Sequence, residues 1–378
     1  MIGMIGPSRV LLFAALVLLG ACASSSSPLL TTLDSPGPGT WAEDVRRVGL
    51  SPDELVNPLA YTEEMKLEAE SAAGDTGLPA ERLRRLQNYL FQRSEGFNYE
   101  TFGTATAIEA FETRSGNCVA FTNLFIAMSR SLGIPAVPAL VQTGGGSTET
   151  DGDLTLVKNH IVALLDEGGR ASIYDFFRLR NSPVAGIQPI DDLWMAAIYQ
   201  NNKGVQALRD GDTFGAMTLF ESAVKLAPSY AAGYGNLGVT RRRTGDPYGA
   251  LDTYLVALQI DRHNTAIRTN LTGLLQDLAP EAPDDEMQAG DRALAQGELK
   301  RARKHYRRAR KLRPERHESL VALARVELLR GRLAHAKELL SLASAAAADD
   351  EQARRLLAAL DRLEQAPPMW PVHLTGTP

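Results

Sequence analysis

The chain has 378 residues, of which 44% are hydrophobic and 22% are charged. This is the composition of ordinary soluble globular proteins, and the length allows about two domains of roughly 150 residues each. The formal net charge of −5 provides no overall attraction to nucleic acid, so we expect no nucleic-acid partner.

Residues 1–22 have the pattern of a secretory signal. Arg9 precedes an apolar run from Val10 to Leu19, which is too short to span a bilayer core of ~30 Å. The sequence Leu-Gly-Ala-Cys that ends at Cys22 resembles the lipobox of bacterial lipoproteins. The resemblance implies that Cys22 is lipidated, becomes the first residue of the mature chain and anchors it to a membrane. An ordinary secretory signal cut near Ala21 is the alternative.

The residues after Cys22 indicate where the chain is sent. Ala23 follows it, and resemblance to enterobacterial sorting then implies the outer membrane, on its periplasmic side. Residues 23–40 are rich in Ser, Pro and Gly, which predicts a flexible tether. If Cys22 carries lipid, Cys118 has no intrachain disulfide partner, because the chain has two cysteines. A lone thiol in an oxidising compartment is open to oxidation, so we expect it to be deeply buried or catalytic.

Residues 41–198 mix helical and strand signals, which predicts an α+β domain. Helices are predicted over 79–92 and 104–111. After a further helix that begins at Cys118, a strand is predicted over 136–142 and a polar loop over 144–153.

The helix that begins at Cys118 is the most informative of these elements. Gly116 and Asn117 favour a helix start, and apolar residues follow at helical spacing. Gly133 and Pro135 end the helix. A thiol on the first turn meets free backbone N–H groups and the positive end of the helix dipole, and both favour the nucleophilic thiolate.

The next strand is predicted over 154–165, and the Asp-Glu-Gly-Gly-Arg sequence after it turns the chain into a returning strand over 171–177. A two-residue turn at Glu167-Gly168 would place His160 directly opposite Asp175. A turn at Gly168-Gly169 would make them diagonal neighbours on one face, still within reach. A three-residue loop would put them on opposite faces.

The domain therefore holds one cysteine, one histidine and an aspartate that a hairpin sets beside the histidine. Thiol acyl chemistry needs this set, because an imidazole takes the thiol proton and a carboxylate orients the imidazole. Taken singly, Cys118 can be a buried structural thiol, His160 a core histidine and Asp175 a solvated side chain. One Cys and one His do not make a metal-ligand set, so neither a metal nor a cofactor is expected.

The stretch from Thr104 to Ala136, with Cys118, His160 and Asp175 in this order, resembles the transglutaminase-like cysteine superfamily, which has a papain-like fold. The resemblance covers about residues 100–180 and is nearest to the bacterial lipoprotein branch that carries helical repeats. It implies a triad in which Cys118 is the nucleophile, His160 the base and then the acid, and Asp175 the orienting carboxylate. The backbone N–H of Cys118 would be one oxyanion donor, and Tyr99 is a weak further candidate.

Internal repetition predicts tetratricopeptide repeats over 199–365. Four units place glycine, alanine, an aromatic residue or leucine, and alanine at matching positions, 34 residues apart within each pair of units. The positions are Gly211, Ala216, Phe220 and Ala223; Gly245, Ala250, Tyr254 and Ala257; Gly297, Ala302, Tyr306 and Ala309; and Gly331, Ala336, Leu340 and Ala343.

The repeat spacing breaks between the second and third units. A helix is predicted over 265–278, and an acidic, proline-containing segment over 279–286 interrupts the array. Residues 351–365 are predicted to form a capping helix, and 366–378 a disordered tail. Such repeats are expected to bind a protein partner.

Residues 300–316 are strongly basic, because ten of these seventeen residues are Lys or Arg. This charge favours an acidic partner, such as anionic lipid head groups or a phosphorylated saccharide. The alternative is a solvated outer helix face near the acidic segment that precedes it.

Together these patterns predict an outer-membrane lipoprotein with a papain-like, transglutaminase-like domain followed by an all-α repeat solenoid. The favoured activity is cysteine-dependent acyl transfer: hydrolysis or transamidation of an amide bond in a protein or peptide. Two alternatives remain open. One is a non-catalytic envelope scaffold, and the other is an assembly factor for exported polysaccharide or cell-wall machinery.

Overall fold

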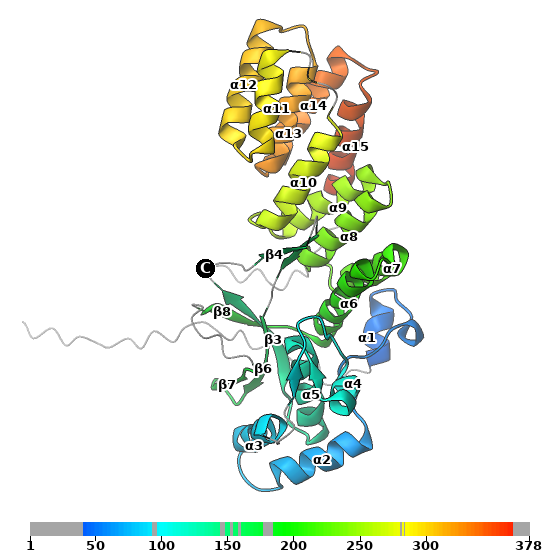
Figure 1. Ribbon diagram of the computed structural model, residues 1–378, viewed down its shortest axis with the longest axis vertical. Helices are drawn as coiled ribbons and strands as arrows, with labels where there is room; N and C mark the ends of the chain where they lie inside the picture. Colours follow the sequence, from blue (N-terminus) through cyan, green and yellow to red (C-terminus); the bar gives the residue numbers. More distant parts are fainter. Residues whose placement is uncertain are drawn as a thin grey trace, which may run out of the picture. The chain divides into compact units, whose positions relative to one another are not determined.

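The computed structural model (Figure 1) describes residues 41–92, 97–143, 148–151, 154–157, 160–176, 184–279, 282 and 284–365. The predicted signal and lipobox with Cys22, the tether over 23–40 and the tail over 366–378 lie outside these residues. Within the described ranges, no helix has both the length and the apolar character needed to cross a bilayer.

The N-terminal region begins with helices. They are α1 (Trp41–Arg47), the 3-10 helix η1 (Pro52–Glu54), α2 (Glu63–Ala73), α3 (Pro79–Gln92), α4 (Ala107–Thr113) and α5 (Cys118–Ser131). The helices predicted over 79–92 and from Cys118 are confirmed. The helix predicted over 104–111 begins later because Thr106 caps it: its hydroxyl accepts from the Glu109 N–H at 3.1 Å, and the Glu109 carboxylate accepts from the Thr106 N–H at 2.8 Å.

The described strands form three small sheets. They are β1 (Asn98–Tyr99), β2 (Ser115–Gly116), β3 (Val137–Thr143), β4 (Thr148–Asp151), β5 (Leu154–Val157), β6 (His160–Asp166), β7 (Ala171–Tyr174) and β8 (Val184–Pro189). Four of them make an antiparallel sheet in the order β7-β6-β3-β8, while β1 pairs with β2 in parallel and β4 with β5 in antiparallel. Helix α5 packs against the four-stranded sheet, mainly on β6 (Figure 1).

Two expectations for this region are wrong. The single strand predicted over 154–165 is two strands, because β5 pairs with β4 whereas β6 pairs with β3 and β7. The polar loop predicted over 144–153 contains β4, which forms a hairpin with β5. The two residues between β4 and β5 in the sequence are Gly152-Asp153, a dipeptide that signals a two-residue hairpin.

The β6–β7 hairpin adopts the second of the two registers considered. Leu164 pairs with Ile173 and Asp166 with Ala171, and the Glu167 N–H donates to the Arg170 carbonyl at 3.1 Å. The turn therefore lies at Gly168-Gly169. Both glycines have positive φ, of 72° and 96°, as a two-residue hairpin turn matched to the twist of the strands requires.

Helical hairpins make up the rest of the described chain. The helices are α6 (Asp192–Arg209), α7 (Thr213–Leu226), α8 (Ala231–Arg243), α9 (Pro247–Ile260), α10 (Thr265–Asp277), α11 (Asp285–Ala295), α12 (Leu299–Leu312), α13 (Glu318–Leu329), α14 (Leu333–Ala346) and α15 (Glu351–Gln365). The four predicted units are the pairs α6–α7, α8–α9, α11–α12 and α13–α14. Helix α10 follows the second pair, and α15 packs on α14 as the predicted capping helix.

In each of the first three helical hairpins, a glycine of the first helix packs against an aromatic ring of the second helix. An added Cβ would lie 2.7 Å from Phe220 at Gly204, 2.5 Å from Tyr254 at Gly238 and 2.2 Å from Tyr306 at Gly290. The three rings are fully buried. The first helix of each pair therefore needs a residue without a side chain where the aromatic ring of the second helix crosses it.

Helix α6 belongs to both hydrophobic cores. Met195 and Ile198 pack in the core of the N-terminal region, while Val205 and Leu208 pack in the core of the repeats. The domain boundary predicted between residues 198 and 199 thus falls inside one continuous helix.

Candidate active site

The thiol of Cys118 lies at the start of a buried helix. Cys118 is the first residue of α5, and its side chain is free and partly exposed. Asn117 caps the helix, because its side-chain oxygen accepts from the N–H groups of Val119 at 3.0 Å and Ala120 at 3.2 Å. From Val119 to Ser129 the helix is buried, so its N-terminus and the thiol on it are held rigidly.

The turn before Cys118 is held from several directions. The Asn117 side chain donates to the Thr104 hydroxyl at 2.6 Å, and Asn202 of α6 donates to the same hydroxyl at 3.2 Å. Gly116 has a φ of 147°, and a Cβ there would lie 2.4 Å from the Ala120 side chain and 2.8 Å from the Gly103 carbonyl oxygen. Only glycine fits this position. The roles of Thr104 and Asn202 could not be predicted from the sequence, because no local spacing connects them with Asn117.

His160 and Asp175 are in direct contact. The Nε2 atom of His160, the first residue of β6, lies 2.7 Å from Oδ1 of Asp175, just after β7. The Cys118 side chain is close enough to the same imidazole to raise its pKa. Because Nε2 faces the carboxylate, Nδ1 is the ring nitrogen left for the thiol. The structure therefore brings the three side chains singled out in the sequence into one chain of contacts.

Two further groups hold Asp175 in place beyond the end of its strand. Gln87 of α3 donates to the Asp175 carbonyl oxygen at 3.2 Å. The next residue, Phe176, stacks on Phe121 of α5 with ring centroids 5.2 Å apart and meets Phe125 of the same helix edge-on at 5.3 Å. Aromatic packing on the helix that carries Cys118 thus positions the carboxylate. Nothing in the sequence spacing marks Gln87 for this role.

The electrostatics favour a charged imidazole. Burial lowers the pKa of His160, but hydrogen bonds to Asp175 and Cys118 and the negative charge of these two groups outweigh it and raise the pKa to about 9. His160 is therefore protonated at neutral pH. Its positive charge lies next to the Asp175 carboxylate and the Cys118 side chain.

Comparison with known families agrees with this architecture. The family model of the transglutaminase-like superfamily matches residues 66–160, and that of the tetratricopeptide repeat matches residues 293–360. The chain joins a transglutaminase-like domain to tetratricopeptide repeats. The transglutaminase-like match contains Cys118 and ends at His160, so Asp175 lies beyond it.

Several solved structures resemble part of the chain. A thermophilic tetratricopeptide-repeat protein in Thermus thermophilus is 23% identical, with 43% of this chain and 98% of that chain covered and a TM-score of 0.23. For YrrB, a repeat protein with an unusual peptide-binding site, the values are 18%, 42%, 90% and 0.22. For the pilF protein of Pseudomonas aeruginosa they are 22%, 45%, 69% and 0.22. Curated proteins yielded no match.

Tyr99 of the transglutaminase-like domain lies beside the Cys118 turn. Strand β1 pairs Tyr99 with Gly116, and the Glu100 N–H donates to the Gly116 carbonyl at 3.0 Å. The Tyr99 side chain is 46% exposed. Its role as an oxyanion donor stays a prediction. The N–H of Cys118, as that of a first helical residue, has no partner within the helix.

The described part of the transglutaminase-like domain and of the repeats brings together no group of three or more His, Cys, Asp or Glu side chains that could hold a metal ion.

Proposed function

We propose that the transglutaminase-like domain is a thiol-dependent acyl-transfer enzyme that acts on amide bonds of a protein or peptide. One observation carries the proposal: His160 contacts both the Cys118 side chain and, through Nε2, the Asp175 carboxylate. A structural cysteine does not need a charged imidazole that is itself oriented by a carboxylate. The match to an enzyme superfamily over residues 66–160 supports the same reading.

In the first half of the reaction, the Cys118 thiolate attacks the amide carbonyl carbon and a carbon–sulfur bond forms. The developing oxyanion is placed to accept from the free N–H at the start of α5. As the carbon–nitrogen bond breaks, the His160 imidazolium gives its proton to the leaving amine. A thioester on Cys118 and a neutral imidazole remain, and Asp175 keeps the ring oriented.

In the second half, neutral His160 takes a proton from the acyl acceptor. Water as acceptor gives a carboxylic acid, and a primary amine gives a new amide. The carbon–sulfur bond breaks, the Cys118 thiolate leaves, and His160 holds the proton again. Hydrolysis and transamidation thus use the same three side chains and differ in the acceptor alone.

The proposal includes a location and a partner. A lipid on Cys22 would anchor the chain to the outer membrane, with both domains in the periplasm, and the repeats would bind a protein partner. The lipobox pattern at residues 19–22 supports the anchor. Cys22→Ala is expected to release the chain from the membrane fraction; a processed variant that still sediments with membranes in high salt would refute the lipid.

The activity is tested with p-nitrophenyl acetate on the chain without its first 22 residues. Wild type is expected to release nitrophenolate in a burst and then turn over, with the acetyl group found on Cys118 by mass spectrometry. Cys118→Ala should show neither phase, and His160→Ala should lose most of the burst. If wild type and His160→Ala acylate at the same rate, Cys118 is an ordinary thiol, and a non-catalytic scaffold or assembly factor becomes the better proposal.

A further inference from the structure

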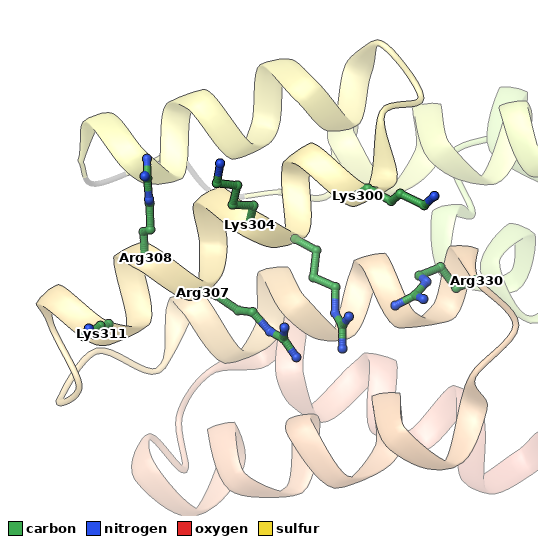
Figure 2. Close-up of a pocket in the computed structure, with 7 residues that line it drawn as sticks. Lys300, Lys304, Arg307, Arg308, Lys311 and Arg330 are labelled. Carbon is green, nitrogen blue, oxygen red and sulfur yellow. The ribbon is translucent and has the colours of Figure 1, made fainter.

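A pocket of about 370 Å³ in the repeat domain is lined entirely by basic side chains. Helix α12 contributes six of them and Arg330, at the end of α13, the seventh (Figure 2). The residues of this basic pocket are Lys300, Arg303, Lys304, Arg307, Arg308, Lys311 and Arg330. It lies far along the sequence from Cys118, and the acyl-transfer proposal does not use it.

The basic side chains of α12 share one broad face of the helix because of helical spacing. Lys300, Lys304, Arg307 and Lys311 recur at every third or fourth position of α12, so they follow one another along the helix over about 16 Å. In Figure 2, Arg307 of α12 and Arg330 point into the space between α12 and α13. The pocket therefore combines cations of α12 with a cation from the end of α13. A helix face that was only solvated would not need the second helix to contribute a cation.

The acidic groups nearby neutralise only part of this charge. Glu327 of α13, whose side chain is 1% exposed, pairs with Arg303 at 2.8 Å, with Arg330 at 3.1 Å and with Arg332 at 3.8 Å. One buried carboxylate thus serves three guanidinium groups. Burial and the neighbouring charges of Arg307, Arg330 and Arg332 lower the pKa of Arg303, which reflects the same crowding of positive charge.

Several cations of the pocket have no acidic partner in the described structure. Glu286 pairs with Arg308 at 3.7 Å, but no ion pair reaches Lys300, Lys304, Arg307 or Lys311 from any described residue. Cations held this close repel one another, and a bound anion removes that cost. A bound anionic ligand would thus neutralise the excess positive charge of the pocket.

We propose that the basic pocket binds a ligand that carries two or more phosphate groups. A phosphate monoester brings a charge of about −1.5 to −2 and three acceptor oxygens, whereas a carboxylate offsets a single cation. Arginine matches phosphate with paired N–H donors. The volume suits a head group or a small phosphorylated molecule rather than an extended polymer, since ligand pockets span about 300–1,000 Å³.

The two sources of such a ligand, a soluble phosphorylated molecule and a lipid head group, share this chemistry. The soluble arm of the test is calorimetric titration with tripolyphosphate at low salt. The lipid arm is sedimentation with vesicles of phosphatidylcholine, alone or mixed with phosphatidylinositol 4,5-bisphosphate, whose head group carries two phosphate monoesters. Binding in the soluble arm alone identifies a soluble ligand. Binding that requires the bisphosphate lipid identifies a head group.

Arg307→Glu is the test variant, because Arg307 is exposed and no described residue forms an ion pair with it. The matched control is Arg313→Glu, an exposed arginine of the same basic stretch that does not line the pocket. Arg307→Glu is expected to weaken binding by about tenfold or more, as for the loss of one charge-assisted hydrogen bond, with an unchanged melting curve. Arg313→Glu should stay within about threefold of wild type.

The proposal is overturned if wild type binds in neither arm at low salt. It is also overturned if Arg313→Glu weakens binding as much as Arg307→Glu, because general surface attraction then suffices. Binding of a DNA oligomer more tightly than tripolyphosphate would likewise show an unspecific polyanion surface. None of these outcomes depends on the reactivity of Cys118, so the acyl-transfer proposal stands or falls separately.

Discussion

The repeats and the transglutaminase-like domain depend on their side chains in opposite ways. In the repeats a contact such as Gly238 on Tyr254 joins two successive helices, and equivalent contacts recur in neighbouring units. In the transglutaminase-like domain, Cys118, His160 and Asp175 come from separate parts of the chain. Unlike the repeat contacts, their contacts have no equivalent in a neighbouring unit. A repeat contact therefore contributes stability that its neighbours partly share, while a site contact contributes chemistry that nothing else in the chain replaces.

The first prediction tests the structural half of this contrast. Gly238→Ala forces a methyl group against the buried Tyr254 ring, at 2.5 Å, and should lower the free energy of unfolding by about 1–3 kcal/mol. Gly273→Ala in α10 is the control, because its Cβ would meet only the Arg242 side chain at 3.5 Å. It should instead stabilise by about 0.5–1 kcal/mol through helix propensity.

Urea unfolding and the rate of Cys118 alkylation are measured together for both glycine variants. The alkylation rate should stay at the wild-type value while the unfolding curve moves. A Gly238→Ala variant as stable as wild type would mean that the glycine–aromatic contact does not limit the repeats.

The second prediction tests the chemical half. His160→Ala should slow alkylation of Cys118 by iodoacetamide near pH 6 by about tenfold or more, because it removes the imidazole that the proposed reaction uses as base. Asp175→Asn should slow it less, because it misorients the imidazole without removing it. The double variant His160→Ala, Asp175→Asn should react only slightly more slowly than His160→Ala alone, as expected for residues that share one step.

One outcome would contradict the idea that Cys118, His160 and Asp175 act together. If His160→Ala and wild type react at equal rates, Cys118 is a lone thiol. The contrast between repeat contacts that stabilise and site contacts that contribute chemistry then no longer holds. Melting temperatures of all three variants serve as the control for folding.

The third prediction compares the same kind of helix cap in the two regions. Asn117 caps α5, and Asn264 caps α10 by accepting from the Ile267 N–H at 3.1 Å. Replacing either by Ala should cost about 1 kcal/mol of stability. Asn117→Ala should also slow Cys118 alkylation, because the helix terminus that supports the thiolate loosens, whereas Asn264→Ala should not. Equal alkylation rates in the two variants would show that the cap is structural only.

The fourth prediction concerns the pH dependence of stability. The folded chain raises the pKa of His160 from 6.5 to about 9, so the bound proton stabilises the fold fully below pH 6.5, and this contribution is lost as pH rises through about 9. The stability difference between wild type and His160→Gln should therefore shrink between pH 6 and pH 9.5. A difference that is constant over this range would contradict the raised pKa.

Elements whose signals are local could be predicted from the amino-acid sequence. The repeat units follow from small and aromatic residues at fixed spacing, and the Cys118 helix follows from Asn117 before it and Gly133 after it. Helix caps, glycine stops and apolar periodicity act within a few residues, so no distant contact is needed to recognise them. The α+β fold, the repeat fold and the order of the three site residues were predictable on this basis.

Features that depend on distant partners could not be predicted from the sequence and follow from the packing of the folded chain. The hairpin signals were compatible with two registers, and the Gly168-Gly169 turn selected one. The division of 154–165 into two strands depends on which neighbours each half pairs with, because a strand has no fixed partner in its own sequence. Gln87 and Asn202 reach the site from helices far away along the chain.

The basic stretch shows the same limit from the side of charge. The sequence shows ten Lys or Arg residues in this stretch, but the fold determines which of them line the pocket. Arg330 arrives from α13, and the buried Glu327 holds Arg303 beside it. Charge is a property of composition, whereas a pocket is a property of how two helices pack, and only the packed chain places cations from both around one space.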